Sequence, residues 1–164
     1  MTRFAAPIAE QIWDMKYRFK KADGTPIDET VEQTWERIAG ALAEAEKDPK
    51  AWGPKFYSAL EDFKYLPAGR ITAGAGTARQ VTLFNCFVMG TVPDSMGGIF
   101  DMLKEAALTM QQGGGIGYDF STIRPKGASV LGVAADASGP LSFMDVWDAM
   151  CRTIMSAGSR RGAM

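Results

Sequence analysis

The chain has 164 residues, 46% of them hydrophobic, and a formal net charge of −1; this length suits one domain, or a small domain followed by the start of a larger one. A charge so near zero gives no electrostatic reason to expect nucleic acid or an anionic membrane as a partner. Histidine is absent and the two cysteines lie far apart in the sequence, which excludes a histidine-based triad, a Cys-x-x-Cys redox loop and a cysteine–histidine zinc cluster.

Residues 1–66 are predicted to be helical. Apolar residues recur at helical spacing from Pro7 to Phe19. We expect Asp28 to cap a second helix, and a third helix to follow Pro49 or Pro54. These two helices carry apolar stripes, formed by Val31, Trp35, Ile38 and Leu42 and by Phe56, Leu60 and Phe63.

The composition of the chain changes at Leu66. From Pro67 the sequence reads PAGRITAGAGTARQ, which is poor in large apolar residues and predicts a loop of the kind that lines sites. An apolar, β-prone run follows from Val81 to Met89 and predicts a buried strand that contains Cys86. We therefore divide the chain into a helical region, residues 1–66, and a second region, residues 67–164.

Two long helices are predicted in the second region. Asp94 or Ser95 caps the first, at 96–111, and Ser138-Gly139-Pro140 opens the second, at 140–156. Their apolar stripes are Ile99, Leu103, Ala106 and Met110, and Phe143, Val146, Trp147, Met150 and Ile154. No apolar run approaches the ~20 residues that cross a bilayer, and the N-terminus has no signal-peptide core, so we expect a cytoplasmic protein.

Three features allow both a chemical and a structural interpretation. The glycines at 113–117 fit neither a Walker A loop nor a dinucleotide fingerprint; they either let a ligand approach the backbone or form a helix C-cap and tight turn. Cys86 is either a reactive or a buried structural thiol, and Cys151 lies beside the stripe of the last helix. Cations next to Gly or Pro either hold an anion or are solvated; they are Arg124, Lys126, Arg160 and Arg161.

Several segments taken together resemble one protein family. They are Asn85-Cys86-Phe87-Val88, Pro93-Asp94-Ser95, GGGIGYDFSTIRPKG at 113–127, SGPLSFMDVWDAM at 138–150 and the arginine–glycine end at 158–163. In this order and spacing they resemble the ribonucleotide reductase large subunit, in its class II, adenosylcobalamin-dependent branch. The resemblance implies an α+β, mainly helical fold: an N-terminal helical region, followed by the first strands and helices of a ten-stranded α/β barrel that is incomplete in this sequence.

The resemblance also implies roles for residues near the substrate. Cys86 looks like one of the two cysteines that reduce the ribose and become a disulfide. Asn85 and Gly115 match positions where the family's backbone approaches the substrate, and the loop around Arg70 and Thr72 is expected to face it. A strand can hold a reducing thiol rigidly, as such a step requires.

A second group of residues resembles the family's allosteric site. Asp94, Ser95 and Met96 match the stretch that holds the deoxynucleoside of an effector, and Arg124 matches an arginine on its phosphates. Arg160 looks like the arginine of the loop that passes effector identity to the substrate base. The expected effectors are ATP and deoxynucleoside triphosphates.

The implied reaction reduces a ribonucleotide to a 2′-deoxyribonucleotide for DNA synthesis and repair. In the branch resembled, adenosylcobalamin, whose site would lie mostly outside this sequence, generates a cysteine thiyl radical, and a thioredoxin-type protein regenerates the reducing thiols. We expect no metal site among these residues. The family's radical cysteine and the partner of Cys86 lie later in the chain, so these 164 residues are expected to be inactive without the remainder of the reductase.

We also expect a homodimer through the helices at 96–111 and 140–156, because so short a chain offers little to cover both apolar stripes, with Trp147 in the interface. Two other functions are considered. One is a non-catalytic nucleotide-binding or dimerisation module, which would not need Cys86. The other is a nicotinamide-dependent oxidoreductase, which the glycines suggest but their position after a helix disfavours.

Overall fold

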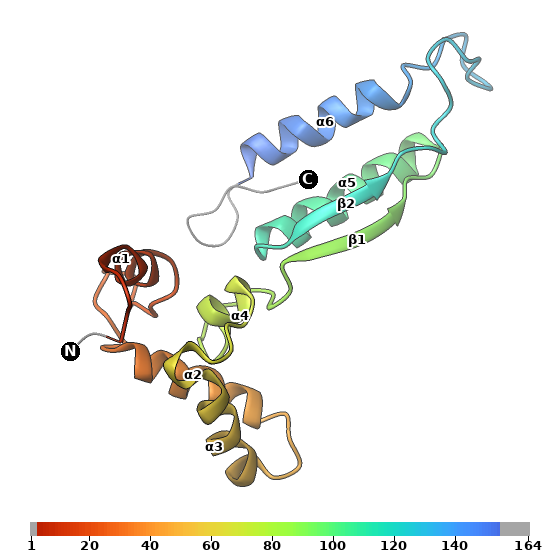
Figure 1. Ribbon diagram of the computed structural model, residues 1–164. Helices are drawn as coiled ribbons and strands as arrows, with labels where there is room; N and C mark the ends of the chain where they lie inside the picture. Colours follow the sequence, from red (N-terminus) through yellow and green to blue (C-terminus); the bar gives the residue numbers. More distant parts are fainter. Residues whose placement is uncertain (1–2, 155–164) are drawn as a thin grey trace. The chain divides into compact units, whose positions relative to one another are not determined.

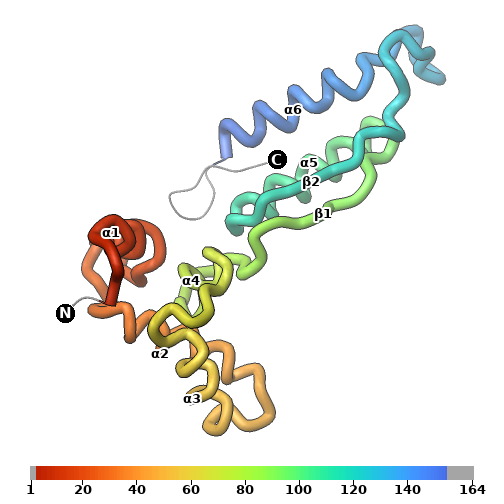
Figure 2. Tube along the Cα trace, viewed as in Figure 1, coloured from red at the N-terminus to blue at the C-terminus, as the bar shows by residue number. Residues whose placement is uncertain are grey.

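The chain folds into two compact units that divide between Phe84 and Asn85, in a computed structural model that describes residues 3–154 (Figure 1). The division predicted from composition, after residue 66, lies earlier because residues 67–84 pack with the first unit. The trace in Figure 2 follows the first unit from red to yellow-green and the second from green to blue. Within residues 3–154, no helix has both the length and the apolar character needed to cross a membrane.

Helices make up the first unit as the apolar spacing predicts. They are α1 (Pro7–Lys16), α2 (Val31–Ala43), α3 (Pro49–Leu60), a single 3₁₀ turn η1 (Glu61–Phe63) and α4 (Gly69–Gly74). The side chain of Asp48 caps α3 by accepting the Ala51 N–H at 3.1 Å. The core is formed by Trp13, Val31, Trp35, Ile38, Ala39, Leu60 and Ala75.

Two local expectations for the first unit are wrong. Asp28 does not cap α2: Thr30 does, and Asp28 is buried with its carboxylate bound by the Arg37 guanidinium. The segment after Pro67 is not a loop throughout, because α4 occupies residues 69–74. Its Gly, Ala and Thr residues give no amphipathic stripe, so periodicity could not reveal it.

The second unit contains a strand–helix–strand motif followed by a long helix. Its elements are β1 (Cys86–Thr91), α5 (Met96–Gln111), β2 (Gly115–Asp119) and α6 (Pro140–Thr153). The strands are parallel, with Cys86 opposite Gly115 and Thr91 opposite Asp119, and a bulge interrupts the register between Val88 and Gly90. The helices at 96–111 and from 140 onward are confirmed, and Ser95 caps α5 by accepting the Gly98 N–H at 3.1 Å. The last residues expected in α6, 155 and 156, lie outside the described part of the chain.

The predicted strand is displaced toward the C-terminus and is not buried. It begins at Cys86 rather than Val81, and alternate residues are exposed, with Val88 at 96%. Only the other face of the strand pair packs against helices, so a run of apolar residues did not mean burial on both faces.

The expectation that Trp147 lies in a dimer interface is wrong. Its side chain is fully buried within its own chain. The indole ring packs against Tyr118 at 5.8 Å and Phe120 at 5.2 Å between ring centroids. The apolar stripes of α5 and α6 thus meet one another and β2, in a core of Val92, Ile99, Ala106, Met110, Ile116, Ile123 and Trp147.

Candidate functional site

On one face of the β1–β2 pair two glycines of β2 contribute no side chain, and Cys86 lies on that face. Cys86 pairs with Gly115 and Val88 with Gly117. Paired residues of neighbouring parallel strands project to the same face. The two glycines therefore add no side chain beside the exposed thiol, and a flat ligand can approach the backbone there.

The opposite face of the β1–β2 pair packs against the helices of the same unit. Ile116 is buried against α5 and α6 as part of the core. Gly114 lies so close to the Phe87 ring that an added Cβ would be 2.6 Å from its Cε2 atom. The Gly115 N–H donates a hydrogen bond of 2.8 Å to the Asn85 carbonyl, so the predicted residues Asn85, Cys86 and Gly115 are brought together.

The glycine segment combines the two interpretations left open by its sequence. Gly113 follows α5 with a φ of 92°, a left-handed conformation that favours glycine and ends the helix. Gly115 and Gly117 belong to β2 instead. The first glycine therefore serves the turn, and the later two keep the face beside Cys86 open.

Cys151 is a packed thiol rather than a second open one. It is partly buried, and its Sγ atom lies 3.6 Å from the Met110 Sδ atom. Burial raises the pKa of the Cys151 thiol, and the nearby Asp148 carboxylate adds to the effect. Across residues 3–154, no three or more carboxylate, cysteine or histidine side chains converge in a way that could hold a metal ion.

A second site lies at the N-terminal end of α5, where a cavity of about 410 Å³ opens. Asp94, Ser95, Met96 and Arg124 are among the residues that line it. The structure thus brings four of the five predicted effector residues together. The rest of its wall is Ile99, Ile123, Val130, Leu131, Val133, Ala135, Asp136, Ala137, Ser138, Gly139 and Phe143.

Asp94 and Arg124 are joined by an ion pair at this cavity. The Arg124 Nε atom donates to Asp94 Oδ2 at 2.8 Å, and the Arg124 backbone N–H donates to Oδ1 at 3.2 Å. These hydrogen bonds, led by the backbone one, hold the pKa of Asp94 below its usual range. Arg124 also donates to the Ser129 carbonyl at 3.1 Å, so an arginine and a carboxylate are presented to a ligand in a fixed geometry.

The other predicted site residues lie elsewhere. Arg70 and Thr72 are on α4 of the first unit. The Thr72 hydroxyl is directed to its own helix, donating to the Pro67 and Ala68 carbonyls at 3.3 and 3.4 Å. Arg160 lies outside the described residues.

Sequence reasoning missed two features. Residues 130–139, which line part of the cavity, were not among the predicted site residues, although the apolar Val130, Leu131 and Val133 could have indicated that this segment covers a cavity. The buried pair of Asp28 and Arg37 was missed because their contact depends on the tertiary fold.

Comparison with known proteins assigns both units to one family. A family profile described as "Ribonucleotide reductase, all-alpha domain" matches residues 3–80, and one described as "Ribonucleotide reductase, barrel domain" matches residues 84–164. The junction between them falls close to the division between the two compact units.

Individual relatives agree with the two profiles. The chain is 34% identical to the ribonucleoside-diphosphate reductase subunit alpha of Helicobacter pylori over 149 residues, 91% of this chain and 18% of the relative. It is 33% identical over 153 residues to a vitamin B12-dependent ribonucleoside-diphosphate reductase of Mycobacterium tuberculosis, covering 90% of this chain and 22% of the relative. For the vitamin B12-dependent enzyme of Thermoplasma acidophilum the values are 32% over 158 residues, 96% and 20%.

The chain thus spans about a fifth of the length of these relatives. The match runs through both structural units and includes the strand of Cys86 and the cavity at Asp94. The chain belongs to the ribonucleotide reductase family, and contains the all-alpha domain and the start of the barrel domain of its large subunit.

Proposed function

We propose that this chain forms part of the catalytic subunit of a ribonucleotide reductase, which replaces the 2′-hydroxyl of a ribonucleotide with hydrogen. The observation that carries the proposal is the exposed Cys86 thiol on a strand face kept open by Gly115 and Gly117. A ribose can lie against that face, with its 2′ carbon next to a thiol that the strand holds in place.

The chemistry requires two electrons and two protons. One ribonucleotide and two thiols give one deoxyribonucleotide, one water and one disulfide, with the 2′-hydroxyl leaving as the water. Cys86 supplies one of the two thiols. Cys151 is packed against Met110, so we assign the second thiol to the remainder of the reductase, and a thioredoxin-type dithiol would reduce the disulfide again.

The cavity at Asp94 is proposed as the site of a deoxynucleotide effector. The Asp94 carboxylate accepts from a ribose hydroxyl, and the remaining N–H groups of Arg124 donate to phosphate oxygens. Val130, Leu131 and Val133, which also line the cavity, provide apolar surface for a base. Arg160 is proposed to belong to the same system.

Adenosylcobalamin is proposed as the radical source, as the vitamin B12-dependent relatives suggest. The Helicobacter pylori subunit alpha is as similar in sequence as they are. We assign none of the described residues 3–154 to this cofactor. No step above therefore depends on it, and the roles of Cys86 and Asp94 are the same with another radical source.

The test uses Cys86→Ser in the reductase formed by this chain and the remainder of its barrel. The variant should lose repeated turnover of ribonucleotide with a dithiol reductant and should still bind a deoxynucleoside triphosphate. Cys151→Ser is the matched control and should turn over normally. If the Cys86→Ser enzyme turned over normally, Cys86 would take no part in the reaction. This chain would then serve the reductase as a nucleotide-binding module, the second function that the cavity at Asp94 supports.

We also propose that the subunit forms a homodimer through α5 and α6, but through the faces that their packing leaves exposed. On α5 these faces carry Phe100 and Leu108, and on α6 Leu141 and Met144. Phe100→Lys together with Leu141→Lys should shift sedimentation to a monomer without loss of helical circular dichroism. A variant that still sediments as a dimer would show that these faces are not the interface.

A further inference from the structure

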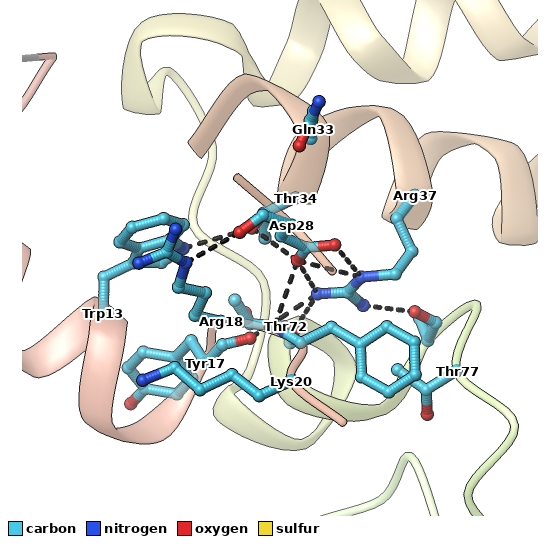
Figure 3. A network of polar contacts seen from close by, with 12 residues as sticks. Trp13, Tyr17, Arg18, Lys20, Asp28, Gln33, Thr34, Arg37, Thr72 and Thr77 are labelled. Atoms are coloured by element: carbon cyan, nitrogen blue, oxygen red, sulfur yellow. Dashed lines mark hydrogen bonds and ion pairs between the residues drawn. The ribbon is translucent and has the colours of Figure 1, made fainter. Parts of the chain in front are cut away.

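The first unit contains a buried arginine, Arg37 on α2, that joins elements far apart in sequence (Figure 3). Its side chain is 9% exposed, and that of its partner Asp28 is 4% exposed. Arg37 Nη2 lies 2.9 Å from Asp28 Oδ2, and Nε is 3.2 and 3.1 Å from Oδ1 and Oδ2. The guanidinium is therefore held along one edge by both carboxylate oxygens.

Asp28 is itself fixed by further donors. Its Oδ2 atom accepts from the Phe19 backbone N–H at 3.2 Å and from the Thr34 hydroxyl at 2.7 Å. Thr34 in turn accepts from the indole N–H of Trp13 at 3.1 Å. A carboxylate bound by this many donors cannot turn, so it sets the direction of Arg37.

Two further hydrogen bonds of Arg37 hold the backbone at the end of α4. Nη2 donates to the Thr72 carbonyl at 3.1 Å, and Nη1 donates to the Ala75 carbonyl. Gly76, with a φ of +69°, lies so close that an added Cβ would be 2.7 Å from Arg37 Cγ and 2.8 Å from the Arg37 carbonyl oxygen. The chain leaving α4 is thus pressed directly against the arginine.

The residues that follow are held to the same unit. Arg79 donates to the Lys20 carbonyl at 3.1 Å. The guanidinium carbons of Arg79 and Arg37 lie 5.4 and 5.7 Å from the centre of the Phe19 ring, a distance at which cations are attracted to aromatic rings. We call residues 75–84 the entry segment, because they run from α4 to the residue before Asn85 and the strand of Cys86.

We propose that Arg37, directed by Asp28, is a positioning residue of the reductase: it fixes α4 and the entry segment, the part of the chain that leads to the strand of Cys86. This rests on the function proposed above for Cys86. The Thr72 and Ala75 carbonyls that Arg37 binds lie at the end of α4, where the entry segment begins. In the assembled reductase these contacts would limit the motion of the residues that precede Cys86.

Arg37→Lys tests this in the reductase formed by this chain and the remainder of its barrel. Lysine keeps the charge, but its single ammonium cannot bridge the carboxylate and both carbonyls. Hydrogen exchange of the entry segment should become about 10-fold faster while α2 and α3 keep wild-type rates. The kcat for ribonucleotide reduction should fall roughly 10- to 100-fold, with the effector Kd unchanged.

Arg18→Lys is the matched control. Arg18 donates to the Asp28 carbonyl at 2.7 Å and the Glu29 carbonyl at 3.0 Å, and pairs with Asp14 at 2.8 Å. It therefore touches the same loop by contacts that do not involve α4. Wild-type exchange in the entry segment and wild-type kcat are expected for this variant.

A second variant, Gly76→Ala, displaces the entry segment without changing the guanidinium or the carboxylate. It should reproduce both effects if Arg37→Lys fails to fold. The proposal is overturned if the entry segment exchanges at wild-type rates in the folded variants, or if it loosens while kcat and KM stay unchanged. Failure of the proposed function would give a different result. The wild-type reductase would then form no deoxynucleotide, whereas the exchange rates of the entry segment would still report on the contacts of Arg37.

Discussion

Two glycines of one segment should respond in opposite ways to the same substitution. A Cβ at Gly114 would lie 2.6 Å from Cε2 and 2.8 Å from Cδ2 of Phe87, whereas carbon atoms pack best at about 3.5–4.0 Å. The ring must then retreat by roughly 1 Å, and overpacking of this kind costs about 1–3 kcal/mol. At Gly117 the nearest atom to an added Cβ is the Phe87 carbonyl oxygen, at 3.9 Å, which is ordinary contact.

Gly114→Ala is therefore expected to lower the melting temperature by roughly 2–12 °C, and Gly117→Ala to leave it unchanged or slightly raised. Neither glycine has a positive φ, so the pair differs in the space around the Cβ rather than in backbone strain. Thermal unfolding followed by circular dichroism measures both. A Gly114→Ala variant as stable as the wild type, or a Gly117→Ala variant that is less stable, would contradict the packing described for β1 and β2.

Three further predictions concern the thiols, the effector site and the core. Iodoacetamide at mildly alkaline pH should label Cys86 before Cys151, whose pKa is raised by burial; equal labelling by mass spectrometry would argue against the packing of Cys151. Because the pKa of Asp94 is lowered, its pair with Arg124 should persist through the pH range in which aspartate usually takes up a proton and be lost only below that range. Effector binding measured between about pH 5 and 8 should therefore not report Asp94 protonation. Trp147→Glu should unfold the second unit, since an unpaired buried charge costs several kcal/mol; a folded monomer by circular dichroism and sedimentation would refute this.

Helices with a strong apolar stripe and a capping residue could be predicted from the sequence. The helix at 96–111 was predicted with its cap at Asp94 or Ser95, and Ser95 is the cap; periodicity and capping are both local properties of the sequence. Asp28 shows where local reasoning fails: its side chain suits a cap, but a buried arginine nine residues away binds it instead. Such a pairing depends on how the helices pack, which one stretch of sequence does not encode.

For the candidate sites too, some residues could be named from the sequence, whereas their geometry could not. Resemblance named Asn85, Cys86 and Gly115, and the parallel pairing of β1 and β2 brings these three together. Sequence did not indicate that the strand face beside Cys86 is open, since that follows from the register of the pairing. The sequence also did not reveal that the stripe containing Trp147 is covered within its own chain. The spacing of apolar residues on a helix predicts that a face will be buried but does not identify the element that covers it.

The bulge between Val88 and Gly90 affects which changes in the length of β1 the protein tolerates. Side chains alternate between the faces of a regular strand, so Cys86 and Thr91, five positions apart, would project to opposite faces. The extra residue shifts the phase by one, and Thr91 pairs with Asp119 on the face of Cys86. Deleting Met89 would remove the bulge and leave Cys86 and Thr91 four positions apart, a spacing that a regular strand also places on one face. Loss of one residue at the bulge is therefore compatible with the pairing of both ends of β1 with β2, so homologues can differ in length by one residue at this position without turning either end of the strand over.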